Sequence, residues 1–186
     1  MKYIKTQFEN LWICQPTLLG DSRGYFYETF NEAHFKKHTN LAVHFVQDNQ
    51  SLSKYGVLRG LHMQGGAFAQ AKLVRCLKGE VLDVVVDMRK DQPTFGKSFS
   101  IMLSEENHTQ LFIPKGFAHG FAVLSDEAIF VYKCDNFYDK ASEIGVDYKD
   151  PQFEIDWKIP ENERILSLKD QNNPIFKEAV NQLYAL

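Results

Sequence analysis

Hydrophobic and polar positions alternate with a period of two through the middle of the chain. Seven short runs rich in β-branched and aromatic residues are bounded by Gly, Pro, Asp or Asn, and each run predicts a strand. The runs cover residues 57–62, 72–79, 80–88, 97–103, 109–114, 121–125 and 128–134. No helix-length pattern alternates with them, as a parallel sheet would require. The pattern therefore predicts a mainly β protein, built as an antiparallel sandwich or barrel.

Helix-like patterns occur only near the two ends of the sequence. Residues 31–38 form a short polar run with Asn31 as N-cap, and residues 174–183 keep apolar positions on one face. Pro174 suits the first turn of that second helix. Between residues 147 and 174 prolines and scattered charges interrupt any period, which predicts an irregular segment lying over the sheet surface.

Composition narrows the class of protein. A chain of 186 residues with 44% hydrophobic and 24% charged residues is typical of one globular domain, which we expect to span residues 1–186. The net charge of −3 argues against nucleic acid or an anionic membrane as a partner. The sequence has neither a signal-peptide pattern nor an apolar run of about 18 residues. Cys14, Cys76 and Cys134 stand singly in apolar runs, so we expect buried, reduced thiols in a cytoplasmic protein.

The stretch from Gly56 to Gly79 concentrates the candidate chemistry. It carries Arg59, His62, Lys72 and Arg75 among apolar residues, Gly and Gln. A histidine flanked by apolar residues and near cations suggests a buried titratable group beside an anion site. The sequence IPKGFAHGF at 113–121 supplies a second histidine, His119, in similar surroundings.

Each of these residues also has a purely structural interpretation. Alternation places Tyr132 on the apolar, inward face of the last predicted strand, where a buried hydroxyl often just bonds the backbone. A single histidine in an apolar strand is more often a core residue than a base. Taken alone, Lys72 is typical of a surface lysine. The presence of two such histidines together with an inward tyrosine favours a functional site. Strict alternation separates Arg59 from His62, so both reach one pocket only if Gly60 marks a bulge or twist.

Metal binding is disfavoured by the side chains around His62. Small β-barrels that hold a divalent ion commonly supply His-x-His, a Glu and a later His. Here Gln64 stands two residues after His62, at the position of the second His, and Ala or Gln fills the Glu position. Only the later P-x-G-x-x-H element, ending at His119, matches. Two histidines with amide companions are a poor ligand set, so no metal is expected. Phosphate-loop, dinucleotide and nucleophile-elbow motifs do not occur.

Blocks along nearly the whole chain resemble the dTDP-4-dehydrorhamnose 3,5-epimerase family, part of the cupin superfamily. They are DSRGYFYETF (21–30), FVQDNQS (45–51), GVLRGLHMQ (56–64), AQAKLVRCLKGEVLDVVVDMR (69–89), FIPKGFAHGFAVLSD (112–126), YKCDNFY (132–138) and LSLKD (166–170). The resemblance implies a cupin-type jelly-roll β-barrel with short peripheral helices near both termini. It also implies a homodimer that needs no metal or organic cofactor. The implied reaction converts dTDP-4-dehydro-6-deoxy-glucose to dTDP-4-dehydro-L-rhamnose, on the route to dTDP-L-rhamnose.

The same resemblance assigns roles to individual residues. It implies His62 as the base, Asp170 as the carboxylate paired with that base, Tyr132 as the acid and Lys72 as the group near the sugar C4 oxygen. The implied substrate-binding residues are Arg23, Phe26, Glu28, Gln47, Asp48, Asn49, Arg59, His119, Glu143 and Lys169. Phe26 corresponds to an aromatic that meets the thymine ring, and the N-terminal segment to one that enters the partner subunit's pocket.

Departures from the family pattern leave alternatives open. The family commonly has an aromatic where Met63 stands and proline-containing sequence at residues 65–67, directly after the implied base. A 3- or 5-epimerase acting on another nucleotide-linked 4-keto-6-deoxy sugar is therefore the main alternative. A non-catalytic cupin that binds a nucleotide sugar would be expected to lack one of the four implied catalytic residues, and all four are present. A metal-dependent cupin enzyme is disfavoured by Gln64.

Overall fold

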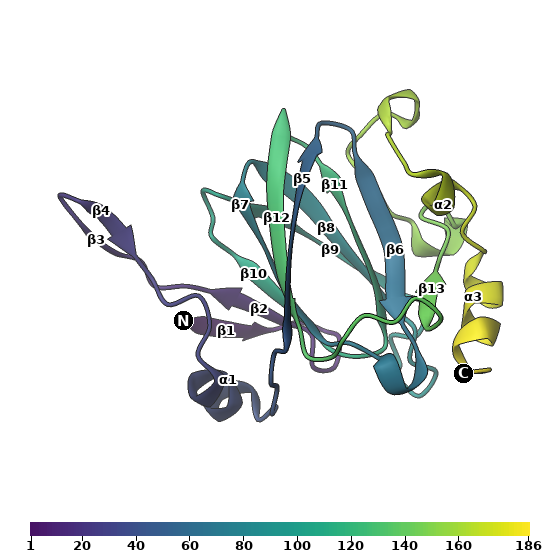
Figure 1. Ribbon diagram of the computed structural model, residues 1–186, viewed down its shortest axis with the longest axis horizontal. Coiled ribbons are helices and arrows are strands. Elements are labelled where there is room, and N and C mark those ends of the chain that lie inside the picture. The colour runs from purple at the N-terminus through teal and green to yellow at the C-terminus, as the bar shows by residue number, and fades with distance from the viewer.

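Two antiparallel sheets face each other in the computed structural model, which describes residues 1–186 (Figure 1). The six-stranded sheet has the order β1 (Lys2–Lys5), β2 (Trp12–Gln15), β10 (Gln110–Ile113), β7 (Lys72–Lys78), β12 (Glu127–Cys134) and β5 (Gln47–Lys54). The five-stranded sheet has the order β13 (Glu143–Gly145), β6 (Leu58–Gln64), β11 (Phe117–Val123), β8 (Glu80–Asp87) and β9 (Ser98–Ser104). Neighbouring strands are often distant in sequence. The predicted mainly β jelly-roll architecture is confirmed.

All seven predicted strands are present, with ends displaced by a few residues. The largest difference is in β11, which begins at Phe117 and so includes His119 in regular pairing. The polar strand β5 was not predicted, because its sequence QDNQSLSK lacks an apolar face. This strand forms because it pairs with β12 along its whole length, and not because of its own composition.

A third, two-stranded sheet forms an arm that projects from the barrel. Its strands are β3 (Leu19–Asp21) and β4 (Gly24–Phe26), and every residue in them is exposed. Figure 1 shows the arm extending from the side of the barrel where the chain begins. Phe26 and Tyr25 are 69% and 60% exposed, an unusual position for two aromatic side chains.

The helices lie near the ends, as predicted. Helix α1 (Glu32–Thr39) starts after Asn31, whose side chain accepts a hydrogen bond from the His34 N–H at 3.0 Å. Helix α3 (Phe176–Leu183) starts after Ile175. The prediction that Pro174 occupies its first turn is wrong, because the Pro174 carbonyl instead accepts a bond from the Asp147 N–H. None of the helices has the length and apolar character needed to cross a membrane.

The segment between Asp147 and Pro174 is irregular, as expected. It contains only the short helix α2 (Leu168–Gln171) and the 3₁₀ turns Pro151–Phe153 and Glu161–Glu163, with a further turn at Gly66–Phe68 earlier in the chain. The three cysteines are free and buried, also as expected.

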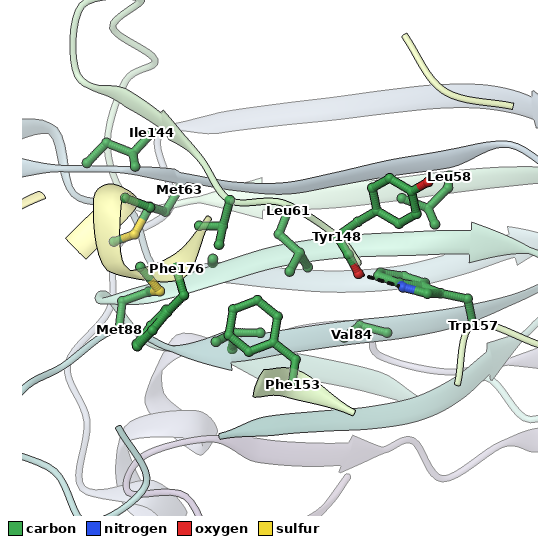
Figure 2. Packing of buried hydrophobic residues seen from close by; sticks show 14 of the residues in the cluster. Leu58, Leu61, Met63, Val84, Met88, Ile144, Tyr148, Phe153, Trp157 and Phe176 are labelled. Atoms are coloured by element: carbon green, nitrogen blue, oxygen red, sulfur yellow. Dashed lines mark hydrogen bonds between the residues drawn. The ribbon is translucent and has the colours of Figure 1, made fainter. Parts of the chain in front are cut away.

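Both faces of the five-stranded sheet are apolar. Its inner face packs against the six-stranded sheet in a core that includes Val85, Phe121 and Phe130. Its outer face is covered by the C-terminal segment, as Figure 2 shows for Phe153, Trp157 and their neighbours. The Trp157 indole N–H donates to the Tyr148 carbonyl at 2.9 Å, so this large side chain is buried without an unpaired donor. The C-terminal segment is therefore fixed to the outside of the barrel.

Strands β6 and β11 approach each other unusually closely at two glycines. A Cβ on Gly60 would lie 2.6 Å from the Gly120 Cα and 2.8 Å from the His119 carbonyl oxygen. His62 pairs with His119 while Arg59 pairs with Phe121, so β6 has one extra residue in this interval. This is the predicted bulge, and it lets Arg59 and His62 reach the same cavity.

Replacing Gly60 tests the importance of this approach. Gly60 has a φ of +122° and Gly24 a φ of +124°, but a Cβ on Gly24 would meet nothing within 4 Å. Both Gly60→Ala and Gly24→Ala introduce backbone strain, whereas only Gly60→Ala also forces β6 and β11 apart. We expect Gly60→Ala to lower the free energy of unfolding, measured in urea, by about 1–3 kcal/mol more than the control does. Equal losses would show that the close approach is not a constraint.

Candidate active site

A cavity of about 640 Å³ opens between the two sheets. This volume is in the range of small-molecule sites. Strands β5, β6, β7, β11 and β12 supply its walls, together with residues 165–170 of the C-terminal segment. Eight of the residues implied by the sequence line it, namely Asn49, Arg59, His62, Lys72, His119, Tyr132, Lys169 and Asp170.

His62 forms a short hydrogen bond with Asp170. The distance from His62 Nε2 to Asp170 Oδ1 is 2.6 Å. Burial alone would raise the pKa of the Asp170 carboxyl, but the hydrogen bond and charge of His62 and the bond with Ser167 together lower it. A carboxylate only accepts hydrogen bonds, so Nε2 donates and Nδ1 of neutral His62 keeps its lone pair. Nδ1 is therefore the nitrogen that can take a proton from a ligand.

A segment that we call the strap, residues 163–172, brings Asp170 to His62 across 108 positions of sequence. Its backbone is anchored beside the start of β6, since the Ile165 N–H donates to the Gly56 carbonyl and the Leu58 N–H to the Ile165 carbonyl. Ser167 then caps α2 by accepting a bond from the Asp170 N–H at 3.1 Å. Asp170, which composition alone would place in a solvated turn, is only 5% exposed.

Lys72 and Tyr132 face His62 from the opposite sheet. The Lys72 ammonium lies 5.8 Å from the centroid of the Tyr132 ring. Both side chains open onto the cavity but are shielded from bulk water. Burial lowers the pKa of Lys72 and, with Cys134 nearby, raises the pKa of Tyr132. Tyr132 is consequently a protonated phenol at neutral pH.

A second histidine–carboxylate pair adjoins the first. His119 is the cross-strand partner of His62, and its Nε2 lies 2.8 Å from Oδ2 of Asp83. Asp83 is fully buried, and its Oδ1 has no hydrogen-bond partner. Burial raises the pKa of Asp83, while His119 and Lys72 act in the opposite direction. Asp83 was missed by the sequence analysis, although an Asp flanked by Leu82 and Val84 in the apolar run EVLDVVVDM was a visible signal of a buried polar contact.

Gln47 and Glu143 line a smaller adjoining cavity of about 260 Å³, which shares His62, Lys72 and Tyr132 with the first. The Glu143 carboxylate accepts hydrogen bonds from the Tyr138 hydroxyl at 3.0 Å and the Lys169 ammonium at 2.5 Å. Burial would raise the pKa of Glu143, but these two bonds lower it. Glu143 thus ties the strap to the loop after β12. Tyr138, 52% exposed at this edge, was not singled out from the sequence.

Four of the implied substrate-binding residues lie outside these cavities in the single chain. Arg23 and Phe26 are on the exposed arm, where Arg23 pairs with Asp21 at 2.6 Å. Glu28 accepts a bond from Asn31 at 3.2 Å. Asp48 points to the outer face of β5 because it alternates with Asn49, and it pairs with Lys133 at 2.9 Å. The fold therefore joins the implied catalytic groups but leaves the N-terminal set apart.

The pairing of Asp170 with His62 predicts a pH-dependent contribution to stability. The folded-state pKa of Asp170 is lowered, so as pH falls the unfolded chain takes up its proton first, at about pH 4. The contribution is complete above that pH and decreases below it. We expect the difference in free energy of unfolding between the wild type and Asp170→Asn to shrink between pH 5 and pH 3. Asp91→Asn, which removes an exposed carboxylate bonded only to Gln92, is the control; a pH-independent difference for Asp170 would contradict the assignment.

Comparisons with known proteins agree with this geometry. Residues 5–178 match the family model described as dTDP-4-dehydrorhamnose 3,5-epimerase. The chain is 52% identical over 179 residues to the enzyme of that name from Shigella flexneri, covering 96% of this chain and 98% of the relative. It is 57% identical to the enzyme of known structure from Elizabethkingia anophelis, with a TM-score of 0.93 over 96% of this chain and 97% of the other. It is 47% identical to a Legionella pneumophila enzyme solved with dTDP-4-keto-L-rhamnose, with a TM-score of 0.90 over 95% and 93% of the two chains. The chain belongs to the dTDP-4-dehydrorhamnose 3,5-epimerase family.

Proposed function

We propose that the chain epimerises C3 and C5 of dTDP-4-dehydro-6-deoxy-glucose and so produces dTDP-4-dehydro-L-rhamnose. The observation that carries the proposal is the His62–Asp170 pair on one wall of the cavity, opposite Tyr132 and Lys72 on the other. A sugar ring bound between the two sheets would present one face to the imidazole and the other to the phenol. The Legionella relative was solved with the ketosugar that this reaction yields.

Proton removal is the first step. The C4 ketone acidifies the C–H bonds at C3 and C5, and Nδ1 of His62 takes the proton while Asp170 stabilises the imidazolium that forms. The electron pair of the broken C–H bond moves to the C4 oxygen as an enolate. Burial lowers the pKa of Lys72, and its ammonium form would stabilise a developing anion beside it more strongly than water does. Comparable oxyanion donors contribute about 3–4 kcal/mol.

Proton return from the other face is the second step. Tyr132 is protonated at neutral pH because burial raises its pKa, and its hydroxyl can donate to the same carbon. The new C–H bond forms on the face opposite His62, which inverts the centre. The phenolate then regains a proton from solvent, and His62 releases its proton to solvent. Each epimerisation is therefore balanced and uses no cofactor.

An epimerase that acts at C3 or C5 alone, on a related nucleotide sugar, is the alternative. It was suggested by Met63 and by residues 65–67 directly after the base, but Gly65 and Gly66 face Leu186. A Cβ on Gly65 would lie 2.7 Å from Leu186, and one on Gly66 would lie 3.5 Å from it. Gly65 thus makes room for Leu186, which gives this glycine a structural role that is independent of the substrate.

We also propose that the protein is a cytoplasmic homodimer in which each 186-residue chain is one domain. The exposed arm, which carries Arg23 and Phe26, and the exposed leucines on the outer face of the six-stranded sheet support the dimer. Leu52 and Leu77 on that face are 60% and 42% exposed, and Leu52 is the cross-strand partner of Ile129. An arm that entered the partner's cavity would add the N-terminal binding residues missing from the single chain. Three free cysteines suit a reducing compartment.

Solvent deuterium separates the two catalytic roles. With the 4-keto substrate in D₂O, followed by NMR, the wild type should incorporate deuterium at C3 and C5 and invert both centres. His62→Ala should lose inversion and exchange together, because no enolate forms. Tyr132→Phe should lose most inversion but keep exchange, because His62 still removes and returns protons on one face.

The controls for this experiment are simple. Circular dichroism should show that both variants keep the β-rich fold. Wild-type exchange in His62→Ala would remove His62 from the mechanism. Equal loss of exchange in both variants would mean that Tyr132 acts before reprotonation. Wild-type exchange at only one carbon would favour the single-centre alternative.

Subunit complementation tests the shared cavity. Arg23→Ala should inactivate the cavity that receives the altered arm, whereas His62→Ala inactivates the cavity of its own chain. In mixed dimers one of the two cavities carries neither change, so mixing the inactive variants should restore up to about half of the activity per mixed dimer. If exchange of tagged subunits is demonstrated and no activity returns, each cavity is built from one chain.

A further inference from the structure

Arg59 is a cation at the cavity wall whose side chain has one hydrogen-bond partner in the protein, the hydroxyl of Ser53. Its Nε donates to Ser53 Oγ at 3.0 Å. No carboxylate lies within ion-pair distance of Arg59, whereas Lys169 at the same cavity is neutralised by Glu143. A guanidinium has five N–H donors, so four remain on its two terminal nitrogens. Arg59 is thus oriented but not neutralised.

Ser53 is well placed to fix that orientation. It is 5% exposed on β5 and pairs with Ala128 in the unbroken register of β5 and β12. The Arg59 backbone is equally fixed, since it lies at the bulge formed by Gly60. A hydrogen bond between two fixed strands restricts the long arginine side chain, which otherwise carries about 2 kcal/mol of rotamer entropy.

Ser53 lies behind the cavity wall. Asn49, Gln50 and Ser51 of the same strand line the cavity together with Arg59, but Ser53 does not. A bound ligand would therefore touch Arg59 and not Ser53. Any effect of Ser53 on ligand binding has to pass through the guanidinium.

We propose that Ser53 is a positioning residue that orients Arg59 for bidentate contact with the diphosphate of the nucleotide sugar. When Nε is held by Ser53, the guanidinium plane is fixed, and the two terminal nitrogens face the same direction as a fork for two phosphate oxygens. This inference rests on the proposed function, because it takes the anionic part of the substrate to be a diphosphate. Ser53 would then influence the affinity for the nucleotide sugar without touching it.

The first test compares four side chains at position 53. Ser53→Ala should raise the Kd for dTDP, measured by calorimetry, and the KM for the ketosugar by about three- to tenfold, with kcat changed less than twofold. Ser53→Thr keeps the hydroxyl and should bind nearly as the wild type does. Ser53→Val has the shape of threonine without the hydroxyl and should behave like Ser53→Ala. Equal affinities for the Thr and Val variants would overturn the proposal, because volume rather than the hydrogen bond would then decide affinity.

A double-substitution cycle supplies the second test. If Ser53 acts through Arg59, Ser53→Ala should weaken dTDP binding in the wild type but have no further effect in the Arg59→Ala background. The same loss in both backgrounds would overturn the proposal and indicate a general disturbance of β5. If the wild type binds dTDP but does not turn over the ketosugar, the proposed reaction is refuted. The binding cycle would still decide the role of Ser53. Wild-type protein that binds no dTDP would refute both.

Discussion

The site depends on the close approach of two backbones at Gly60 and Gly120. Because neither residue has a Cβ, β6 can carry one extra residue opposite β11 without leaving the sheet. That extra residue turns the side chain of Arg59 to the wall that already holds His62. The backbone N–H of Gly60 also favours the charged form of Asp170. One local irregularity thereby brings Arg59, His62 and Asp170, the proposed phosphate-binding cation, base and orienting carboxylate, to one cavity.

Burying the charged groups of the cavity costs free energy, and the apolar packing of the barrel offsets this cost. Asp83 and Asp170 are shielded carboxyls and Lys72 is a shielded cation, each of which water would solvate better. The five-stranded sheet that carries His62, Asp83 and His119 has apolar residues packed against both faces. The C-terminal segment covering its outer face also continues into the strap. The same stretch of chain therefore seals a core and delivers Asp170, so the geometry of the His62–Asp170 pair is supported by packing far from the cavity.

Alternation was sufficient for the seven strands predicted from the sequence, because each of them has an apolar face. It did not reveal β1 to β4 or β13, which are only three or four residues long. It failed for β5, where polar side chains line the cavity on one side and the outer surface on the other. Without that strand, neither the separation of Asp48 from Asn49 nor the contact between Ser53 and Arg59 could be predicted. The bulge at Gly60 could be inferred, because Arg59 and His62 had to converge. Asp170 could be placed only by family resemblance, since a strap that returns across 108 residues leaves no local period.

The position of the arm explains why the cavity of a single chain lacks Arg23 and Phe26, two of the substrate-binding residues implied by the family resemblance. Arg23 is paired with Asp21, but both side chains are largely exposed, at 88% and 51%, where solvent and salt weaken ion pairs. Such a pair offers little resistance to exchange for a diphosphate. Phe26 on the same arm is 69% exposed and adds to the apolar surface of Tyr25 next to it, which is 60% exposed. An exposed ion pair beside an exposed aromatic ring suits an element that packs against a neighbouring chain. In the dimer proposed above, the barrel would supply the chemistry and the arm a part of the substrate recognition.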